Sequence, residues 1–275
     1  MKPTASLSIV FVFPVFAFFV LALAAGAAAP AETAQQRGQR VVDEALKAVG
    51  GSAYLAMQDR VESGRAYSFY REQLEGLSIA KIYTRYLTPV AGKPSVRERQ
   101  NFGKDEYAGL LFNQDGAWEI TFRGARPLEP KRVENWKDGT LRNIFYILRQ
   151  RLKEPGMDFY SRGSDLYENR PVDIVDITDA DGLTVTVYFS QLDKLPVRQF
   201  LKRRNTDYKD FDSEETLFAK YRDIGGGVMW PLSIRRQRNG EKLYEMYSES
   251  VQINKNLKDD LFTLPAKITI LPPAR

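Results

Sequence analysis

Runs in which apolar and polar residues alternate constrain the fold of this chain more than any other feature. Residues 117–124 read "AWEITFRG" and residues 183–190 read "LTVTVYFS". The apolar positions of these two runs are Trp118, Ile120, Phe122, Leu183, Val185, Val187 and Phe189. Because successive side chains of a strand point to opposite faces, this alternation predicts strands with one solvent-exposed face. The turn sequences "NQDG" (113–116), "DADG" (179–182) and "NG" (239–240) predict that the strands form antiparallel hairpins.

Two segments have helical spacing instead. Residues 34–49 place Val41, Val42, Ala45, Leu46 and Val49 on one stripe, Gly50-Gly51 ends it, and a short second helix is predicted from Ser52. Residues 134–156, "ENWKDGTLRNIFYILRQRLKEPG", predict one continuous helix that ends at Pro155-Gly156. The apolar stripe of this inserted helix consists of Leu141, Ile144, Phe145, Leu148 and Leu152. The predicted fold class is therefore α+β, with a large curled antiparallel sheet and helices packed against its apolar face.

The first residues have the order of a secretory signal. Lys2 precedes an apolar run from Leu7 to Ala25, and Ala25-Gly26-Ala27 is a small-x-small cleavage site. We predict a signal peptide over residues 1–27, a single domain over 28–275, and export to the periplasm. An uncleaved membrane anchor is the alternative, because the apolar run approaches the roughly 20 residues of a membrane span.

The absence of two residue types limits the chemistry. The chain of 275 residues contains no histidine and no cysteine, which excludes His- or Cys-based catalysis and metal sites built from these residues. The acidic pairs at 105–106, 214–215 and 259–260 are adjacent, so strand geometry sends the two carboxylates to opposite faces. A net charge of +5 is mild for this length and argues against a nucleic-acid partner. We predict a protein that is not an enzyme and that uses no cofactor or metal.

Residues 221–265 carry a resemblance to a known family. In order, the matching positions are Gly227, Val228, Pro231, Ile234, Val251, Ile253, Asn254, Leu257, Asp260, Phe262 and Pro265. This ending, the "DGAW" at 115–118 and a first helix that stops at Gly-Gly resemble the LolA/LolB-like periplasmic lipoprotein-carrier superfamily. The resemblance implies an incomplete β-barrel wrapped around helices, with an apolar cavity that accepts acyl chains. The chain is longer than the usual carrier and lacks the lipidated cysteine of the outer-membrane acceptor, so the resemblance points to the broader superfamily.

The resemblance also implies where a ligand would bind. The predicted cavity is lined by Trp118, Ile120, Phe122, Val185, Val187 and Phe189, with Phe145 and Leu148 of the inserted helix as a lid. The alternative is that the same residues form a dry, filled core. Basic residues at 202–204 and at Arg235, Arg236 and Arg238 are either the wet face of strands or contacts to phospholipid head groups.

Two hypotheses for function follow. In the first, the protein is a non-enzymatic carrier or binder of a lipid or lipoprotein acyl chain, of the outer-membrane lipoprotein-sorting type, which contacts a membrane surface or an envelope transporter. In the second, a domain of the same fold acts through its surface as an envelope sensor or interaction domain. A hydrolase would need several carboxylates in one cleft, and the sequence has no such spacing.

Overall fold

The computed structural model describes residues 31–106, 108–205, 208 and 210–273. Glu32–Arg275 form one compact unit. The predicted signal peptide, residues 1–27, lies outside the described residues, so its cleavage and the boundary of the following domain stay predictions.

The described residues contain one antiparallel sheet of thirteen strands. The strands are β1 (Asp59–Tyr70), β2 (Gln73–Tyr86), β3 (Val96–Phe102), β4 (Ala108–Asn113), β5 (Gly116–Thr121), β6 (Gly124–Pro127), β7 (Asp158–Tyr167), β8 (Arg170–Thr178), β9 (Thr184–Ser190), β10 (Pro196–Arg204), β11 (Phe211–Asp223), β12 (Met229–Arg238) and β13 (Glu241–Ile253). The predicted turns at 113–116, 179–182 and 239–240 each connect two adjacent strands, as expected.

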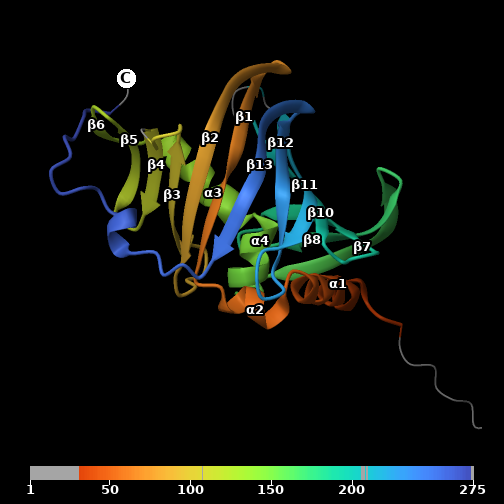
Figure 1. Cartoon of the computed structure of the whole chain (residues 1–275). Helices are drawn as coiled ribbons and strands as arrows, with labels where there is room; N and C mark the ends of the chain where they lie inside the picture. The colour runs from red at the N-terminus through yellow and green to blue at the C-terminus, as the bar shows by residue number, and fades with distance from the viewer. Residues whose placement is uncertain (1–30, 107, 206–207, 209, 274–275) are drawn as a thin grey trace, which may run out of the picture. The chain divides into compact units, whose positions relative to one another are not determined.

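The order of the strands explains how the sheet is assembled. Strands β1 to β6 follow one another in one half, β7 to β13 do so in the other, and the first strand pairs with the last. In that pairing Arg60 opposes Ile253 and Ser68 opposes Tyr244. Strands β6 and β7 are the two edges, so the sheet bends around the helices without closing into a barrel (Figure 1). The predicted fold class is confirmed.

The N-terminal helices form where the sequence predicts them. Helix α1 (Ala34–Ala48) begins at a capping box, in which the Thr33 hydroxyl accepts a hydrogen bond from the Gln36 N–H. Its buried face includes Val41, Val42 and Ala45, and it packs against β7. Helix α2 (Gly51–Ala56) follows after Gly50, whose φ of 122° is a conformation that only glycine adopts without strain.

Gly38 allows α1 to lie directly on β7. A Cβ at this position would lie 2.1 Å from the carbonyl oxygen of Phe159. We therefore expect Gly38→Ala to lower the free energy of unfolding by about 1–3 kcal/mol, although alanine is the better helix former.

Gly139→Ala is the matched control, because Gly139 is also helical and a Cβ there meets nothing within 4 Å. This variant should gain up to ~1 kcal/mol in urea unfolding. Equal stabilities of the two variants would contradict the close packing of α1.

The inserted helix is the main error of the sequence prediction. Residues 130–151 form three pieces: α3 (Pro130–Leu141), the short α4 (Ile144–Tyr146) and a π-helix, η1 (Ile147–Arg151). The break occurs at Asn143, which is extended and whose side-chain oxygen accepts hydrogen bonds from the N–H groups of Phe145 and Tyr146. Asparagine favours such caps, so a new helix starts there in a new direction.

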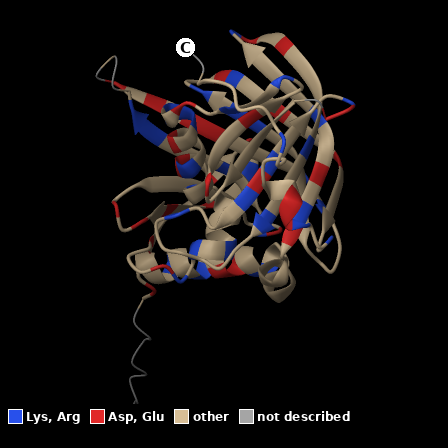
Figure 2. Ribbon diagram, turned by 90° about the vertical axis from the view of Figure 1, so that its left-hand side faces the viewer, with Lys and Arg blue, Asp and Glu red and all other residues tan. Residues whose placement is uncertain are grey.

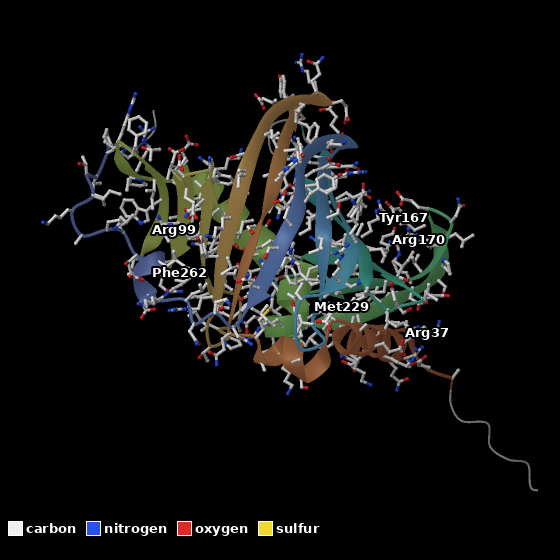
Figure 3. All side chains as sticks on the ribbon, in the orientation of Figure 1. Arg37, Arg99, Tyr167, Arg170, Met229 and Phe262 are labelled. Carbon is white, nitrogen blue, oxygen red and sulfur yellow. The ribbon has the colours of Figure 1, made fainter. Side chains whose placement is uncertain are left out.

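The C-terminal segment packs back onto the sheet. Asn254 and Asn256 both have a φ of 55°, and the 3₁₀ turn η2 (Asp259–Phe262) follows. The Phe262 side chain is fully buried, and Figure 3 shows it beside Arg99 of β3. The Arg99 guanidinium donates to the carbonyl oxygen of Leu261 at 3.2 Å. Because α3 contacts the neighbouring Glu98, η2 covers the face of the sheet opposite α3.

Candidate ligand-binding core

The segment formed by α4 and η1, residues 144–151, fills the middle of the bent sheet, and we call it the plug. Phe145 is 4% exposed and Leu148 is fully buried. The plug packs against α1, α2 and the strands of the second half in one apolar cluster. Five of the eight residues predicted to line a cavity meet in this cluster: Phe145, Leu148, Val185, Val187 and Phe189.

The other three predicted residues lie elsewhere. On β5 it is Ala117 that packs with Phe112 and Leu128 beneath α3. Trp118 and the partly buried Ile120 follow Ala117 at odd spacing, so Trp118 points to the opposite face of the sheet. Phe122 lies just beyond the end of β5 and is 83% exposed. These three residues do not join the five in the core, and ligand binding at any of the eight stays a prediction.

Polar contacts to main-chain atoms hold the plug in place. The Tyr54 hydroxyl donates to the carbonyl oxygen of Phe145 at 2.6 Å, and the side-chain oxygen of Gln199 accepts from the N–H of Ile144 at 3.0 Å. The Tyr146 hydroxyl accepts from the N–H of Ser95 at 2.7 Å. Burial raises the pKa of Tyr54 well above its usual value, so this phenol stays neutral and remains a donor. The plug is thus apolar over residues 144–148, and its polar end adds hydrogen bonds from Arg149, Gln150 and Arg151 to main-chain carbonyl groups.

The sheet facing the plug also carries buried polar residues that the sequence analysis missed. Arg60 of β1 is 9% exposed; its guanidinium donates to the Thr84 hydroxyl at 3.3 Å and lies 3.5 Å from the Glu62 carboxylate. Glu62 in turn accepts a hydrogen bond from the Ser248 hydroxyl. The guanidinium carbon is 4.0 Å from the ring centre of Trp230. The sequence signal was the i, i+2 spacing of Arg60 and Glu62 on one strand face.

Further along the same face, Glu98 connects the sheet to α3. Its carboxylate accepts from the Trp136 indole at 3.2 Å and from the Gln100 amide at 2.6 Å. Burial raises the pKa of the nearby Tyr244 to about 12. The inner face of the sheet is therefore apolar around the plug and polar beside it.

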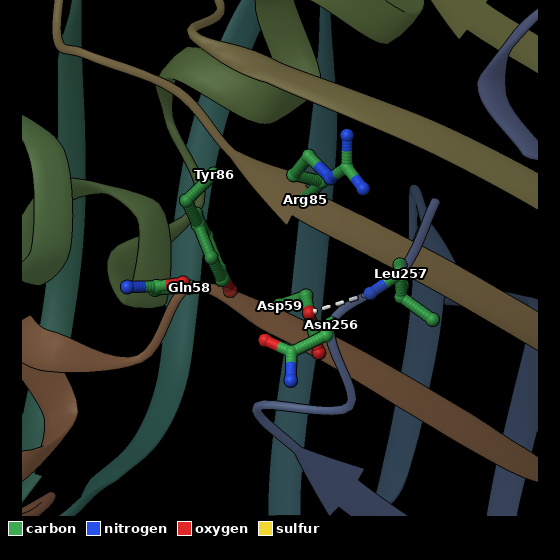
Figure 4. A pocket seen from close by; sticks show the side chains of 6 residues that line it. All are labelled: Gln58, Asp59, Arg85, Tyr86, Asn256 and Leu257. Atoms are coloured by element: carbon green, nitrogen blue, oxygen red, sulfur yellow. Dashed lines mark hydrogen bonds between the residues drawn. The ribbon is translucent and has the colours of Figure 1, made fainter. Parts of the chain in front are cut away.

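A pocket of about 310 Å³ lies at one end of β1 and β2 (Figure 4). It is lined by Gln58, Asp59, Arg85, Tyr86, Asn256 and Leu257. The buried Asp59 carboxylate accepts from the N–H groups of Lys255 at 2.6 Å and Leu257 at 3.0 Å. Arg85 forms an ion pair with Asp259. These charged groups are already engaged in holding the C-terminal segment.

Charges of both signs are interspersed along the strands in Figure 2. Carboxylates of all three acidic pairs are engaged: Glu106 binds Lys81, Glu214 binds Arg203 and Arg238, Glu215 binds Arg198, and Asp259 binds Arg85 and Arg97. Across the part of the chain that the structure describes, no three acidic residues are grouped so that they could hold a metal ion. In the same residues, each helix is too short or too polar to cross a membrane.

Comparison with known proteins gives a clear result for the fold. No protein-family model and no curated protein matches the sequence. A domain from Vibrio parahaemolyticus with the description outer membrane lipoprotein-sorting protein domain superimposes with a TM-score of 0.57 at 10% identity, covering 83% of this chain and 97% of that chain. A DUF1329 family protein from Desulfovibrio piger gives 0.57 at 10% identity, covering 84% and 98%. A LolA superfamily protein from Nitrosomonas europaea gives 0.53 at 12% identity, covering 85% and 98%.

These likenesses extend over most of this chain and nearly all of each matched chain. The resemblance read from residues 221–265 is therefore confirmed at the level of the fold. At 10–12% identity these likenesses show the fold alone. The function therefore has to be argued from the residues of this chain.

Proposed function

We propose that this chain, which has the fold of LolA-like lipoprotein-sorting proteins, is a non-enzymatic periplasmic carrier or binder of a lipid or lipoprotein acyl chain. The observation that carries the proposal is the plug, whose apolar residues 144–148 are held inside a bent sheet. The Phe145 ring lies 5.1 Å from Phe218 and 4.8 Å from Trp230, so its removal would leave a space walled by aromatic rings. Such a space suits hydrocarbon.

In this proposal the plug is the lid of the binding site. In the closed state Phe145 and Leu148 occupy the volume that an acyl chain would enter, and the chain replaces their contacts when the plug moves. Two features favour movement of this segment as a unit. It is separated from α3 by the break at Asn143, and η1 is a π-helix, a form that recurs at functional sites.

A closed core also supports the second hypothesis, an envelope sensor or interaction domain. Val187 and Phe189 are fully buried, as expected of a filled interior. Such a protein would act through its surface, with a protein partner in place of a lipid.

The test is purification of the exported chain without detergent, followed by lipid mass spectrometry and titration with a fluorescent fatty-acyl probe. The carrier proposal predicts a co-purified acyl species or saturable probe binding. Absence of both, together with stable capture of a protein partner, would replace the carrier by the interaction domain. Heat-unfolded protein at the same concentration is the control for nonspecific uptake of the probe.

A further inference from the structure

We infer that Trp230 and Arg60 bind the carbonyl oxygen of a neutral acyl ester or amide. The inference rests on the proposed function and adds to it the chemical class of the ligand. It distinguishes acyl esters and amides from free fatty acids and from plain hydrocarbon, and it places the polar end of the ligand against β1 and β12.

The first observation concerns two buried hydrogen-bond donors, the indole of Trp230 and the guanidinium of Arg60. Trp230 is 3% exposed and Arg60 is 9% exposed. The indole N–H of Trp230 has no hydrogen-bond acceptor among the described residues. The Nε of Arg60 also makes no hydrogen bond there, although it lies 3.5 Å from a Glu62 carboxylate oxygen in an ion pair. The two side chains are in contact, since the guanidinium carbon is 4.0 Å from the indole ring centre. Buried donors are nearly always hydrogen-bonded, so the unpaired indole N–H of Trp230, with the Arg60 guanidinium against its ring, indicates an acceptor from outside the chain.

The second evidence is their position. Trp230 belongs to the apolar cluster around the plug, and the Phe145 ring of the plug lies 4.8 Å from it. Arg60 belongs to the polar residues with Glu62 and Thr84. The two donors therefore lie where the apolar and polar parts of the inner face meet. An acyl chain in the place of Phe145 would bring its first carbonyl group to this boundary.

The local charge selects a neutral acceptor. The positive charge of Arg60 is already compensated by the Glu62 carboxylate, which lies 3.5 Å from its Nε. A ligand carboxylate would therefore add an uncompensated negative charge in a buried site, which is costly. An ester or amide carbonyl accepts the same hydrogen bonds without that charge.

The test compares three competitors of similar chain length, methyl laurate, laurate and dodecane, in displacing the fluorescent acyl probe at neutral pH. The wild type should prefer methyl laurate to both others. Trp230→Phe keeps an aromatic ring and removes the N–H. It should therefore weaken the binding of methyl laurate about two- to tenfold and leave the binding of dodecane unchanged. Trp136→Phe is the matched control, because the Trp136 indole already donates to Glu98. This variant should leave the ratio of the affinities for methyl laurate and dodecane unaltered.

A second measurement uses the wild-type protein, so it does not depend on whether a variant folds. The chain has three tryptophans, so its ¹H–¹⁵N spectrum has three indole signals. The Trp230 indole proton should move downfield with methyl laurate and much less with dodecane. An unchanged ester-to-alkane ratio in Trp230→Phe, or equal shifts with both ligands, would overturn the inference while leaving the carrier proposal intact. If the wild type binds no competitor and no probe, the carrier proposal fails and this inference fails with it.

Discussion

Replacing Phe145 by alanine should lower the free energy of unfolding by about 3–5 kcal/mol, the usual range for a large buried aromatic residue. The ring is 4% exposed and contacts Phe218, Tyr221 and Trp230, so truncation removes apolar burial and leaves a cavity in the centre of the core. Urea unfolding followed by circular dichroism measures the change. Under the carrier proposal the variant should also bind the acyl probe more tightly, because the plug no longer fills the space.

The same substitution at Phe122 is the control. Phe122 is 83% exposed, and its loss should change stability by no more than about 0.5 kcal/mol. If Phe145→Ala lowers the free energy of unfolding as little as Phe122→Ala does, the plug is not packed into the core. Equally tighter probe binding in the Phe122 variant would show that the gain does not come from space opened in the core.

The second large effect is expected at Arg151, the last residue of η1. Its side chain is 4% exposed and pairs with Glu154 at 2.7 Å and with Asp179 at 3.4 Å, both of which are less than a tenth exposed. Arg151→Met leaves two buried carboxylates without their cation, and we expect a loss of about 3–5 kcal/mol at neutral pH. Chemical unfolding at several pH values is the measurement.

The pH dependence of that loss follows from Glu154. Its hydrogen bond from Arg151 lowers the pKa of this carboxyl group below the usual value. A lowered pKa in the folded state stabilises the protein above the unfolded pKa of about 4.3, and this contribution is lost as the pH falls through the folded pKa. The difference between wild type and Arg151→Met should therefore be largest near neutral pH and shrink below about pH 4.

Arg40→Met is the control for this experiment. Arg40 also pairs with two carboxylates, those of Glu32 and Glu44, but its side chain is 50% exposed. Surface pairs contribute little, so this variant should unfold like the wild type. Equal losses at Arg40 and Arg151 would mean that the cost comes from the loss of an arginine in general and not from buried charge.

Much of the sheet was predictable because its strands alternate and its turns have distinctive sequences. Val185, Val187 and Phe189 face the core as their spacing predicts, and Asn239-Gly240 forms the expected hairpin tip. Alternation alone could not give the orientation of β5, since both faces of that region are covered. Helix α3 packs over Ala117 on one face, while Leu111, the cross-strand neighbour of Trp118, is fully buried on the other.

The broken helix and the polar interior could not be read from apolar periodicity. The stripe through Leu141, Ile144 and Leu148 continues across the break, and only Asn143 marks the new start, a weak signal within a helical pattern. Arg60 and Glu62 are charged residues on the inner face of a strand, where an alternation rule assigns them to solvent. Arg60 is covered by Trp230, about 170 positions away in the chain, and no local pattern contains that contact.

The contact between the chain's last residues and β6 has a consequence for self-association. Ile270 forms a parallel bridge with Ala125, and the Leu271 N–H donates to the Ala125 carbonyl oxygen, so this border of the sheet already has a neighbour. Of the described strands, β7 is the other border, and helix α1 lies directly against its main chain at Phe159, where Gly38 leaves room. Each border of the sheet is therefore covered, at least along part of its length, by a segment of the same chain, which limits edge-to-edge pairing with a second molecule.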